Sequence, residues 1–213
     1  MALTKIFEGN AAELRALEAE VHRTYEKRLE IAWREACERF HARYDRLAFP
    51  GGLAKAMSLL AANDPNTIET AVRFLEADPW FFRSGYIKAD ILRQLRRAPL
   101  NNDQRDRLRQ AILTRIRGED RREFRWWCRL APYVTDPEFE RSITDLTLSS
   151  VELVSRHARW ALEHLKPFSH QPRAHTERRS AMSQAAHSLK DSTPGLGPAG
   201  YSRQLSLQVR VGV

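Results

Sequence analysis

The stretch FRWWCRL, residues 124–130, places two tryptophans and a cysteine between two arginines. An arginine guanidinium is planar, binds phosphate or carboxylate through paired hydrogen bonds, and stacks on aromatic rings. Aromatic side chains in a basic groove are also the surface on which proteins stack single-stranded nucleic acid. The chemistry open to these residue types is therefore binding, and it depends on which of them face outward.

A helix through this stretch would have two different sides, because successive residues turn by about 100°. One side collects the apolar residues Phe124, Trp127, Cys128, Leu130 and Ala131. The other side collects Arg122, Arg125 and Arg129. We expect Trp127 to be buried and Trp126, which falls beside Arg122, to lie at the border of an arginine face. In the alternative, Trp126 fills the contact with a neighbouring helix and Arg122 lies over its ring.

The positive charge of the chain is concentrated in one central block. Residues 80–130 hold 14 basic and 6 acidic side chains, and 13 of those 14 are arginine. From residue 166 onward the balance is 7 basic against 2 acidic. Such blocks favour an acidic partner, nucleic acid first and an acidic protein surface second. The alternative is that the arginines reflect the base composition of the genome and only solvate the surface.

Two neighbouring helices add arginines to the predicted binding surface. Their inward apolar stripes consist of Ile87, Ile91, Leu95, Leu108, Ile112 and Ile116. These stripes leave Arg93 and Arg97 outward on one helix, and Arg107 and Arg117 outward on the next. The predicted interface for nucleic acid or an acidic protein comprises Arg93, Arg97, Arg107, Arg117, Arg122, Arg125, Trp126 and Arg129. It forms one surface only if these outward faces align.

Residues 10–47 contain no proline and carry an apolar residue at every third or fourth position, which predicts one continuous helix. At 1.5 Å per residue this helix would be roughly 55 Å long. That is longer than a compact domain of this size is wide, so the helix needs a partner along its length. The rest of the chain could supply it, or a second copy could, through self-association. We assign residues 1–50 to this amphipathic helix.

Pro50, Gly51 and Gly52 end that helix, and shorter helices follow, so the chain is expected to be all-α. An N-cap acid followed by a proline at the first helical position occurs at Asp64-Pro65, Asp78-Pro79 and Asp136-Pro137. The expected helices span residues 53–62, 65–76, 79–97 with a break allowed at Ser84 and Gly85, 102–117, 120–131 and 136–165.

Two helix junctions are alike. Ala98-Pro99 and Ala131-Pro132, 33 positions apart, are each followed by an apolar residue and then by an acid at the next helix start. Together with the Asp-Pro starts, this spacing resembles that of HEAT and armadillo repeats over residues 53–165. The resemblance implies a helical-repeat domain over residues 51–165, in which a short α-solenoid-like array of hairpins stacks on itself. A plain helical bundle is the alternative.

The segment from residue 166 to 213 differs in composition from the rest. It is rich in Pro, Gly, Ser, His and Gln and cannot bury enough apolar surface to order itself, so we expect a disordered basic tail. Alternating apolar residues end the chain at Leu205, Leu207, Val209, Val211 and Val213. This strand pattern fits either a frayed end or addition to the sheet edge of a partner.

The sequence offers no catalytic motif and no metal-binding motif. Cys128 lies on the apolar side of its helix, which favours an inert core cysteine. His157 and His164 share a helix face, but they would be about 10 Å apart along its axis, too far to bind one metal ion. There is no glycine-rich phosphate loop, and we predict no cofactor.

These patterns together predict a non-enzymatic helical module that binds an acidic partner. The second hypothesis is a protein-interaction adaptor or homo-oligomer that uses the long first helix. The third, by fold analogy alone, is a DNA glycosylase on a HEAT-like scaffold. The chain has no run of 18 apolar residues and no secretory signal, so we expect no membrane partner and a cytoplasmic location.

Overall fold

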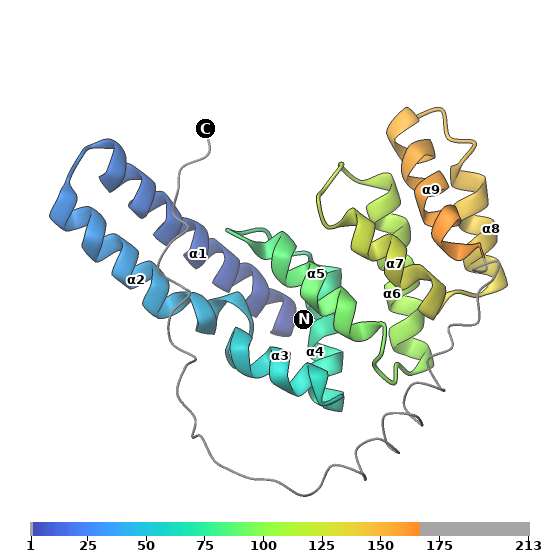
Figure 1. The fold of residues 1–213 in the computed structure, drawn as a ribbon, viewed down its shortest axis with the longest axis horizontal. Coiled ribbons are helices and arrows are strands. Elements are labelled where there is room, and N and C mark those ends of the chain that lie inside the picture. Colours follow the sequence, from blue (N-terminus) through green and yellow to red (C-terminus); the bar gives the residue numbers. More distant parts are fainter. Residues whose placement is uncertain (1, 167–213) are drawn as a thin grey trace, which may run out of the picture. The chain divides into compact units, whose positions relative to one another are not determined.

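The computed structural model describes residues 2–166, most of which lie in helices (Figure 1). The helices are α1 (Ala2–Glu26), α2 (Glu30–Ala48), α3 (Leu53–Ala61), α4 (Pro65–Ala77), α5 (Ser84–Leu95), α6 (Asn102–Arg117), α7 (Phe124–Val134), α8 (Pro137–Leu146) and α9 (Glu152–Leu165). These residues contain no strand and belong to one compact unit, so the predicted all-α fold is confirmed. The predicted tail lies outside the described residues, except for Lys166. None of the nine helices in this part of the chain is long and apolar enough to cross a lipid bilayer.

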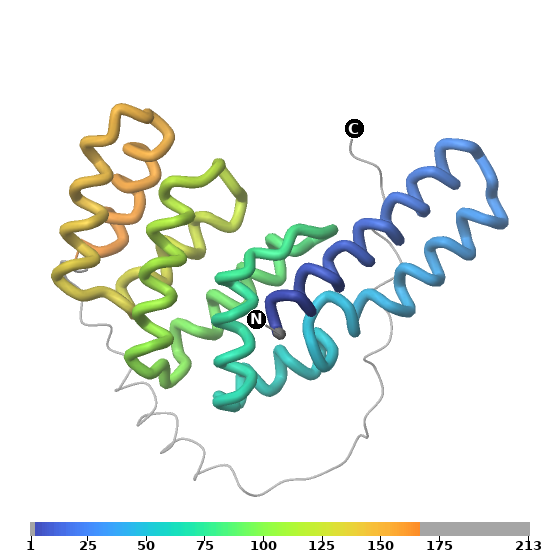
Figure 2. Tube along the Cα trace, turned by 180° about the vertical axis from the view of Figure 1, so that it is seen from behind, coloured from blue at the N-terminus to red at the C-terminus, as the bar shows by residue number. Residues whose placement is uncertain are grey.

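From α3 onward, each helix contacts the helix two positions further along the chain. The contacting pairs are α3 with α5, α4 with α6, α5 with α7, α6 with α8, and α7 with α9. Successive helical hairpins therefore lie against one another, as Figure 2 shows. Each hairpin buries its apolar side on its neighbour, as helical arrays do. The relationship to HEAT or armadillo repeats stays a prediction.

The two junctions that look alike in the sequence differ in the structure. Pro99 lies in the loop between α5 and α6, whereas Pro132 lies inside α7, which continues to Val134. The residue that caps the following helix is Asn101 in the first case and Asp136 in the second. Helix contacts, rather than these two junctions, therefore support the array.

The N-terminal segment folds as a helical hairpin, so the prediction of one continuous helix over residues 10–47 is wrong. The chain turns between Glu26 and Glu30, and α2 runs back along α1. At the turn, Arg28 adopts the left-handed conformation with φ 53°. An ion pair between Glu20 and Arg39, 2.8 Å long, joins the two helices. The partner that the predicted helix needed is therefore its own second half.

This turn leaves little trace in the sequence, because both helices bury the same apolar stripe. Phe7 and Leu14 of α1 and Phe40 of α2 belong to the shared core. The three- and four-residue steps continue through the turn, where the Tyr25 and Trp33 rings have centroids 5.9 Å apart. Folding back buries the stripe without a second chain. Self-association through this segment stays a prediction.

Two of the three Asp-Pro signals start helices as predicted. The Asp64 side chain accepts a hydrogen bond from the backbone N–H of Thr67 at 2.8 Å and begins α4. The Asp136 side chain accepts one from the N–H of Phe139 at 2.8 Å and begins α8. Each bond satisfies a backbone donor that the first turn of a helix leaves free.

The third Asp-Pro pair, Asp78-Pro79, does not start a helix, so that prediction is wrong. Asp78 is the C-cap of α4 in the left-handed conformation, φ 47°, and α5 starts only at Ser84. Basic side chains of later segments bind its carboxylate, so it caps no helix N-terminus. The helix predicted over residues 136–165 is also interrupted between α8 and α9. There the Ser155 hydroxyl donates to the Thr147 carbonyl at 2.7 Å and closes the connection.

Candidate functional site

The apolar side predicted for α7 is confirmed. The buried residues are Phe124, Trp127, Cys128, Leu130 and Ala131. Burial raises the pKa of the Cys128 thiol to about 12, because the thiolate would lose its hydration. At neutral pH this thiol is protonated and enclosed, so Cys128 is a packing residue rather than a nucleophile.

This difference in burial predicts that one of the two cysteines reacts in the folded protein. Cys37 is partly exposed, whereas Cys128 is 1% exposed. We expect a thiol-reactive disulfide reagent at pH 8 to modify one thiol in buffer and both in concentrated urea. A folded Cys37→Ser variant should not react, and modification of that variant in buffer would contradict the burial of Cys128.

Trp126 lies on the other side of α7, where it is half-buried against the edge of the core. The guanidinium carbons of Arg93 and Arg129 lie 4.9 and 4.6 Å from its ring centroid. Trp126 therefore borders arginines, as its position on the helix predicted. The arginine expected over its ring was Arg122, which instead lies over Tyr86 of α5 at 4.8 Å.

Three groups of rings and guanidiniums follow the contact between α5 and α7. The ring of Tyr86 is contacted by Arg83 at 5.5 Å as well as by Arg122, and the ring of Tyr133 is contacted by Arg96 at 5.0 Å. Trp126 with its two arginines forms the third group. We call the set the arginine–aromatic face, and it consists of Arg83, Tyr86, Arg93, Arg96, Arg122, Trp126, Arg129 and Tyr133.

Residues in and next to α5 and α7 meet in the same order along this face. The contacts join Tyr86 to Arg122, Arg93 to Trp126 and Arg96 to Tyr133. The two helices therefore run in the same direction, as equivalent helices of stacked hairpins do. The tyrosine hydroxyls also accept hydrogen bonds from Arg122 and Arg96, which fixes the positions of both guanidiniums.

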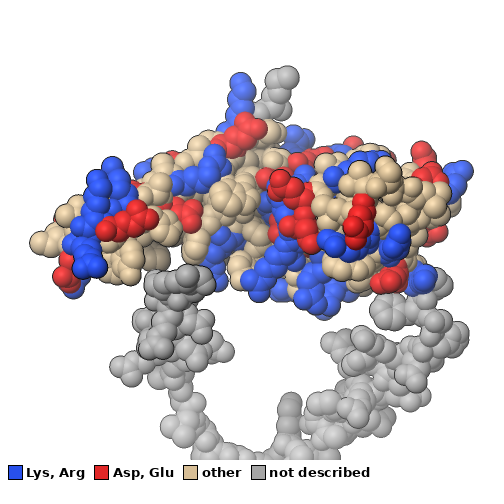
Figure 3. All heavy atoms as spheres, turned by 90° about the horizontal axis from the view of Figure 1, so that it is seen from above, with Lys and Arg blue, Asp and Glu red and all other residues tan. Residues whose placement is uncertain are grey.

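Carboxylates are scarce on the arginine–aromatic face. In the described part of the chain, Asp90 is its one ion-pair partner, with Oδ1 3.0 Å from Nη1 of Arg93. Both side chains of that pair are about half exposed, so water screens their attraction. Figure 3 shows basic side chains gathered along one edge in the middle of the described residues. The face therefore keeps most of its positive charge.

Arg107, predicted to face the same partner, is held elsewhere. Its guanidinium makes ion pairs with Glu69 at 2.8 Å, with Glu76, and with Asp103 at 3.2 Å. Burial would raise the pKa of Glu69, but hydrogen bonds from Arg107 and Arg73 outweigh it and hold that pKa at about 2. Three carboxylates thus neutralise Arg107, and it is not part of the arginine–aromatic face.

The other three predicted arginines are exposed but lie outside the ring–guanidinium groups. Arg117, at the end of α6, donates to the Leu113 carbonyl at 3.3 Å. Within residues 2–166, neither Arg97 nor Arg125 has a side-chain hydrogen bond or an ion pair. The structure thus brings together Arg93, Arg122, Trp126 and Arg129 of the predicted set.

Four members of the face were not predicted from the sequence: Arg83, Tyr86, Arg96 and Tyr133. The signal was present in α7 and the turn before it, where four residues recur at steps of four, three and four, as on one side of a helix: Arg122, Trp126, Arg129 and Tyr133. A search for aromatic residues at helical spacing from arginines would have found that stripe. The pairing between α5 and α7 depends on tertiary packing and could not be found in this way.

No comparison with known proteins informs the function of this site. No family model matches the chain, and neither the curated proteins nor the solved structures contain a match to it. Within residues 2–166, no group of three or more His, Cys, Asp or Glu side chains is placed to hold a metal ion.

Proposed function

We propose that this protein is a binding module for an acidic partner, with nucleic acid as the partner that its chemistry suits best. The observation that carries the proposal is the arginine–aromatic face, where, among residues 2–166, five guanidiniums line one helix pair and one carboxylate pairs with them. Arginines elsewhere in the same block, such as Arg107, are neutralised. The proposal therefore rests on position rather than on total charge.

The aromatic rings orient the guanidiniums before a ligand binds. A cation stacked on an aromatic ring gains about 0.5–1 kcal/mol at an exposed site and loses part of its rotational freedom before binding. The N–H groups at the edge of a stacked guanidinium stay available for phosphate oxygens. Arginine binds such oxygens through two parallel hydrogen bonds.

The state of Trp126 favours recognition of phosphates over recognition of bases. Its ring is half-buried and two guanidiniums lie within 5 Å of its centroid, so little of it is free for a base to stack on. Affinity should then come from the nucleic-acid backbone and depend weakly on sequence. Because phosphate contacts release counterions, binding should weaken steeply as salt is added.

Fluorescence anisotropy of the full chain with labelled single-stranded and duplex DNA and RNA, between 50 and 300 mM salt, tests the proposal. We expect the variant Arg93→Gln/Arg122→Gln/Arg129→Gln to bind more weakly and to have a shallower salt dependence. Each lost phosphate contact should reduce the slope of log K against log salt by about 0.7–0.9.

A matched control removes the same charge from exposed arginines on other helices, through Arg46→Gln/Arg141→Gln/Arg159→Gln. The control variant should retain a slope of log K against log salt closer to that of the unmodified protein. An equal loss in both variants would show that net charge, not the arginine–aromatic face, governs binding. Absence of binding at 50 mM salt would overturn the choice of nucleic acid.

One observation favours the adaptor as a second candidate. At the tip of the α1–α2 hairpin, Tyr25, Leu29 and Ile31 are 56%, 50% and 77% exposed. Neighbouring exposed apolar side chains are typical of protein-interaction surfaces. Light scattering should show a smaller mass for Ile31→Asp than for the unmodified protein if the tip mediates self-association. Equal monomeric masses would remove the self-association version.

A further inference from the structure

A second basic cluster lies where α4 ends, and its centre is the Asp78 carboxylate. Lys88 of α5 binds Oδ1, while Arg115 of α6 and Arg121 of the α6–α7 loop both bind Oδ2. Asp78 is 13% exposed and the Lys88 side chain 1% exposed. None of these four residues belongs to the arginine–aromatic face.

The cluster has more cationic donors than its carboxylate can satisfy. Three cations hydrogen-bond one carboxylate, and two guanidiniums share a single oxygen. Burial lowers the pKa of Lys88, and the Asp78 carboxylate opposes that shift. The Nε of Arg115 is buried and has no acceptor among the described residues. A buried donor without an acceptor costs free energy, and an acceptor placed within hydrogen-bond reach of it would recover that cost.

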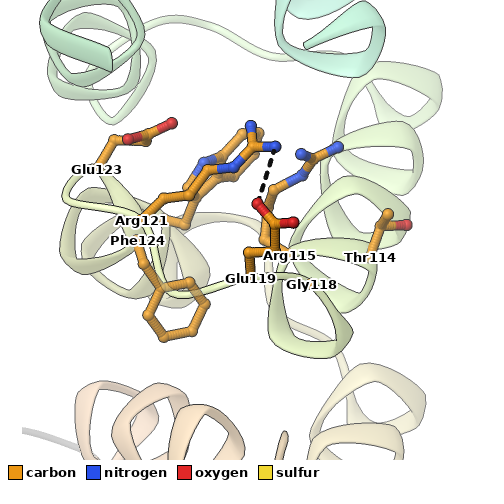
Figure 4. Close-up of a pocket in the computed structure, with 8 residues that line it drawn as sticks. Thr114, Arg115, Gly118, Glu119, Arg121, Glu123 and Phe124 are labelled. Carbon is orange, nitrogen blue, oxygen red and sulfur yellow. Dashed lines mark ion pairs between the residues drawn. The ribbon is translucent and has the colours of Figure 1, made fainter. Parts of the chain in front are cut away.

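A cavity of about 100 Å³ lies directly beside these guanidiniums. Its lining comprises Thr114, Arg115, Gly118, Glu119, Arg121, Glu123, Phe124 and Trp127. Phe124 and Trp127 are core residues, whereas Thr114 is exposed, so the space extends from the core toward the surface. Figure 4 shows the guanidiniums of Arg115 and Arg121 near each other at this space.

Two carboxylates, Glu119 and the buried Glu123, also line the cavity, and Glu123 acts to raise the pKa of Lys88. With Asp78, three carboxylates therefore lie near the three cations, so the case for a ligand rests on unused hydrogen-bond donors rather than on excess charge. Glu119 is 87% exposed, and its oxygen lies 4.0 Å from Arg121, at the limit of an ion pair. The Glu123 carboxylate lies at the first turn of α5, where an added Cβ on Gly85 would be 3.0 Å from its Oε2. There it faces the positive end of a helix dipole.

We propose that this cavity binds a phosphate-sized oxyanion through the donors of Arg115 and Arg121 that Asp78 leaves unused. The ligand class is inorganic phosphate or the phosphomonoester group of a small molecule. This site goes beyond the proposed function, because it uses different arginines from a different part of the fold. A bound anion would accept hydrogen bonds from two adjacent guanidiniums and relieve their mutual repulsion.

The test uses the full chain with inorganic phosphate and, in a second arm, glycerol 3-phosphate. The thermal midpoint is compared with that in sodium chloride of equal ionic strength, and broadening of the phosphorus-31 resonance reports binding directly. We expect a phosphate-specific rise in the midpoint, since a ligand that binds only the folded state stabilises it. A higher thermal midpoint or a broader phosphorus-31 resonance with either ligand supports the site. The same result with glycerol 3-phosphate extends the ligand class to phosphomonoesters.

Thr114→Phe places a ring at the cavity while leaving all the cations intact. We expect it to abolish the phosphate-dependent shift and the line broadening. The control is Thr144→Phe on α8, an exposed threonine whose hydroxyl, like that of Thr114, donates to the carbonyl four residues earlier. If Thr114→Phe fails to fold, Gly118→Val serves instead, because Gly118 has φ −88° and an added Cβ meets nothing closer than 3.4 Å.

Three outcomes would overturn the proposal. The first is no phosphate-specific effect in the unmodified protein, and the second is an equal effect in Thr114→Phe. The third is loss of the effect in the triple variant of the arginine–aromatic face, which would place phosphate there. Nucleic-acid binding by Thr114→Phe should be unchanged, so the failure of one site can be distinguished from the failure of the other.

Discussion

Replacing Asp78 with alanine should destabilise the fold by about 3–5 kcal/mol, the usual cost of removing one partner of a buried ion pair. The loss leaves the buried Lys88 without its hydrogen-bonded carboxylate, beside two guanidiniums that lose their shared acceptor. Lys88 cannot reach water without unpacking α5. Urea unfolding followed by circular dichroism would measure the change in the free energy of unfolding.

Two comparisons separate the buried charge from a general effect of losing a carboxylate. Glu30→Ala removes a carboxylate that is 72% exposed and paired with the exposed Arg34 at 2.5 Å, and it should cost less than about 1 kcal/mol. The double variant Asp78→Ala/Lys88→Met should recover part of the lost stability, because no fully buried cation remains. A loss in Asp78→Ala as small as that in Glu30→Ala would contradict the ionic role of Asp78.

Asp78 also shows how far a local sequence signal reaches. Asp64-Pro65, Asp78-Pro79 and Asp136-Pro137 are equivalent as dipeptides, and two of them start helices. The third differs because basic partners 10, 37 and 43 residues further along the chain bind its carboxylate. Those partners lie outside any window that local pattern analysis uses. Their effect outweighs the N-cap preference of the aspartate.

Helical periodicity predicted which side of each helix is buried but not where the chain reverses. The buried sides of α5, α6 and α7 agree with the apolar stripes at three- and four-residue steps. The turn between α1 and α2 was missed because residues 27–29 contain neither glycine nor proline. An apolar stripe whose two halves pack together in a hairpin has the same sequence pattern as a stripe on one long helix that packs on a separate partner.

The candidate site shows the same division between local and tertiary information. The sequence indicates that arginines are abundant between residues 80 and 130, but not which of them have carboxylate neighbours. Arg107 and Arg93 both lie opposite apolar stripes, yet Arg107 pairs with carboxylates of α4 whereas Arg93 covers Trp126. The packing of α6 on α4 and of α5 on α7 makes that difference.

The adjacent tryptophans of α7 should respond very differently to truncation. Trp127 is 1% exposed, so Trp127→Ala should cost about 3–5 kcal/mol through lost burial and the cavity left behind. Trp126→Ala should cost about 1–2 kcal/mol, because its ring is half-buried and its remaining contacts are with two exposed or half-exposed arginines.

Binding should show the reverse order at temperatures where both variants are folded. Trp126→Ala removes the ring that orients Arg93 and Arg129, so it should weaken nucleic-acid binding although both charges remain. Trp127 contributes to the core and not to the arginine–aromatic face, so the folded fraction of Trp127→Ala should bind normally. Urea unfolding would compare the stabilities of the two variants, and fluorescence anisotropy would compare their affinities for nucleic acid. If Trp126→Ala bound as tightly as the unmodified protein, the rings would be packing elements and the arginines alone would form the interface.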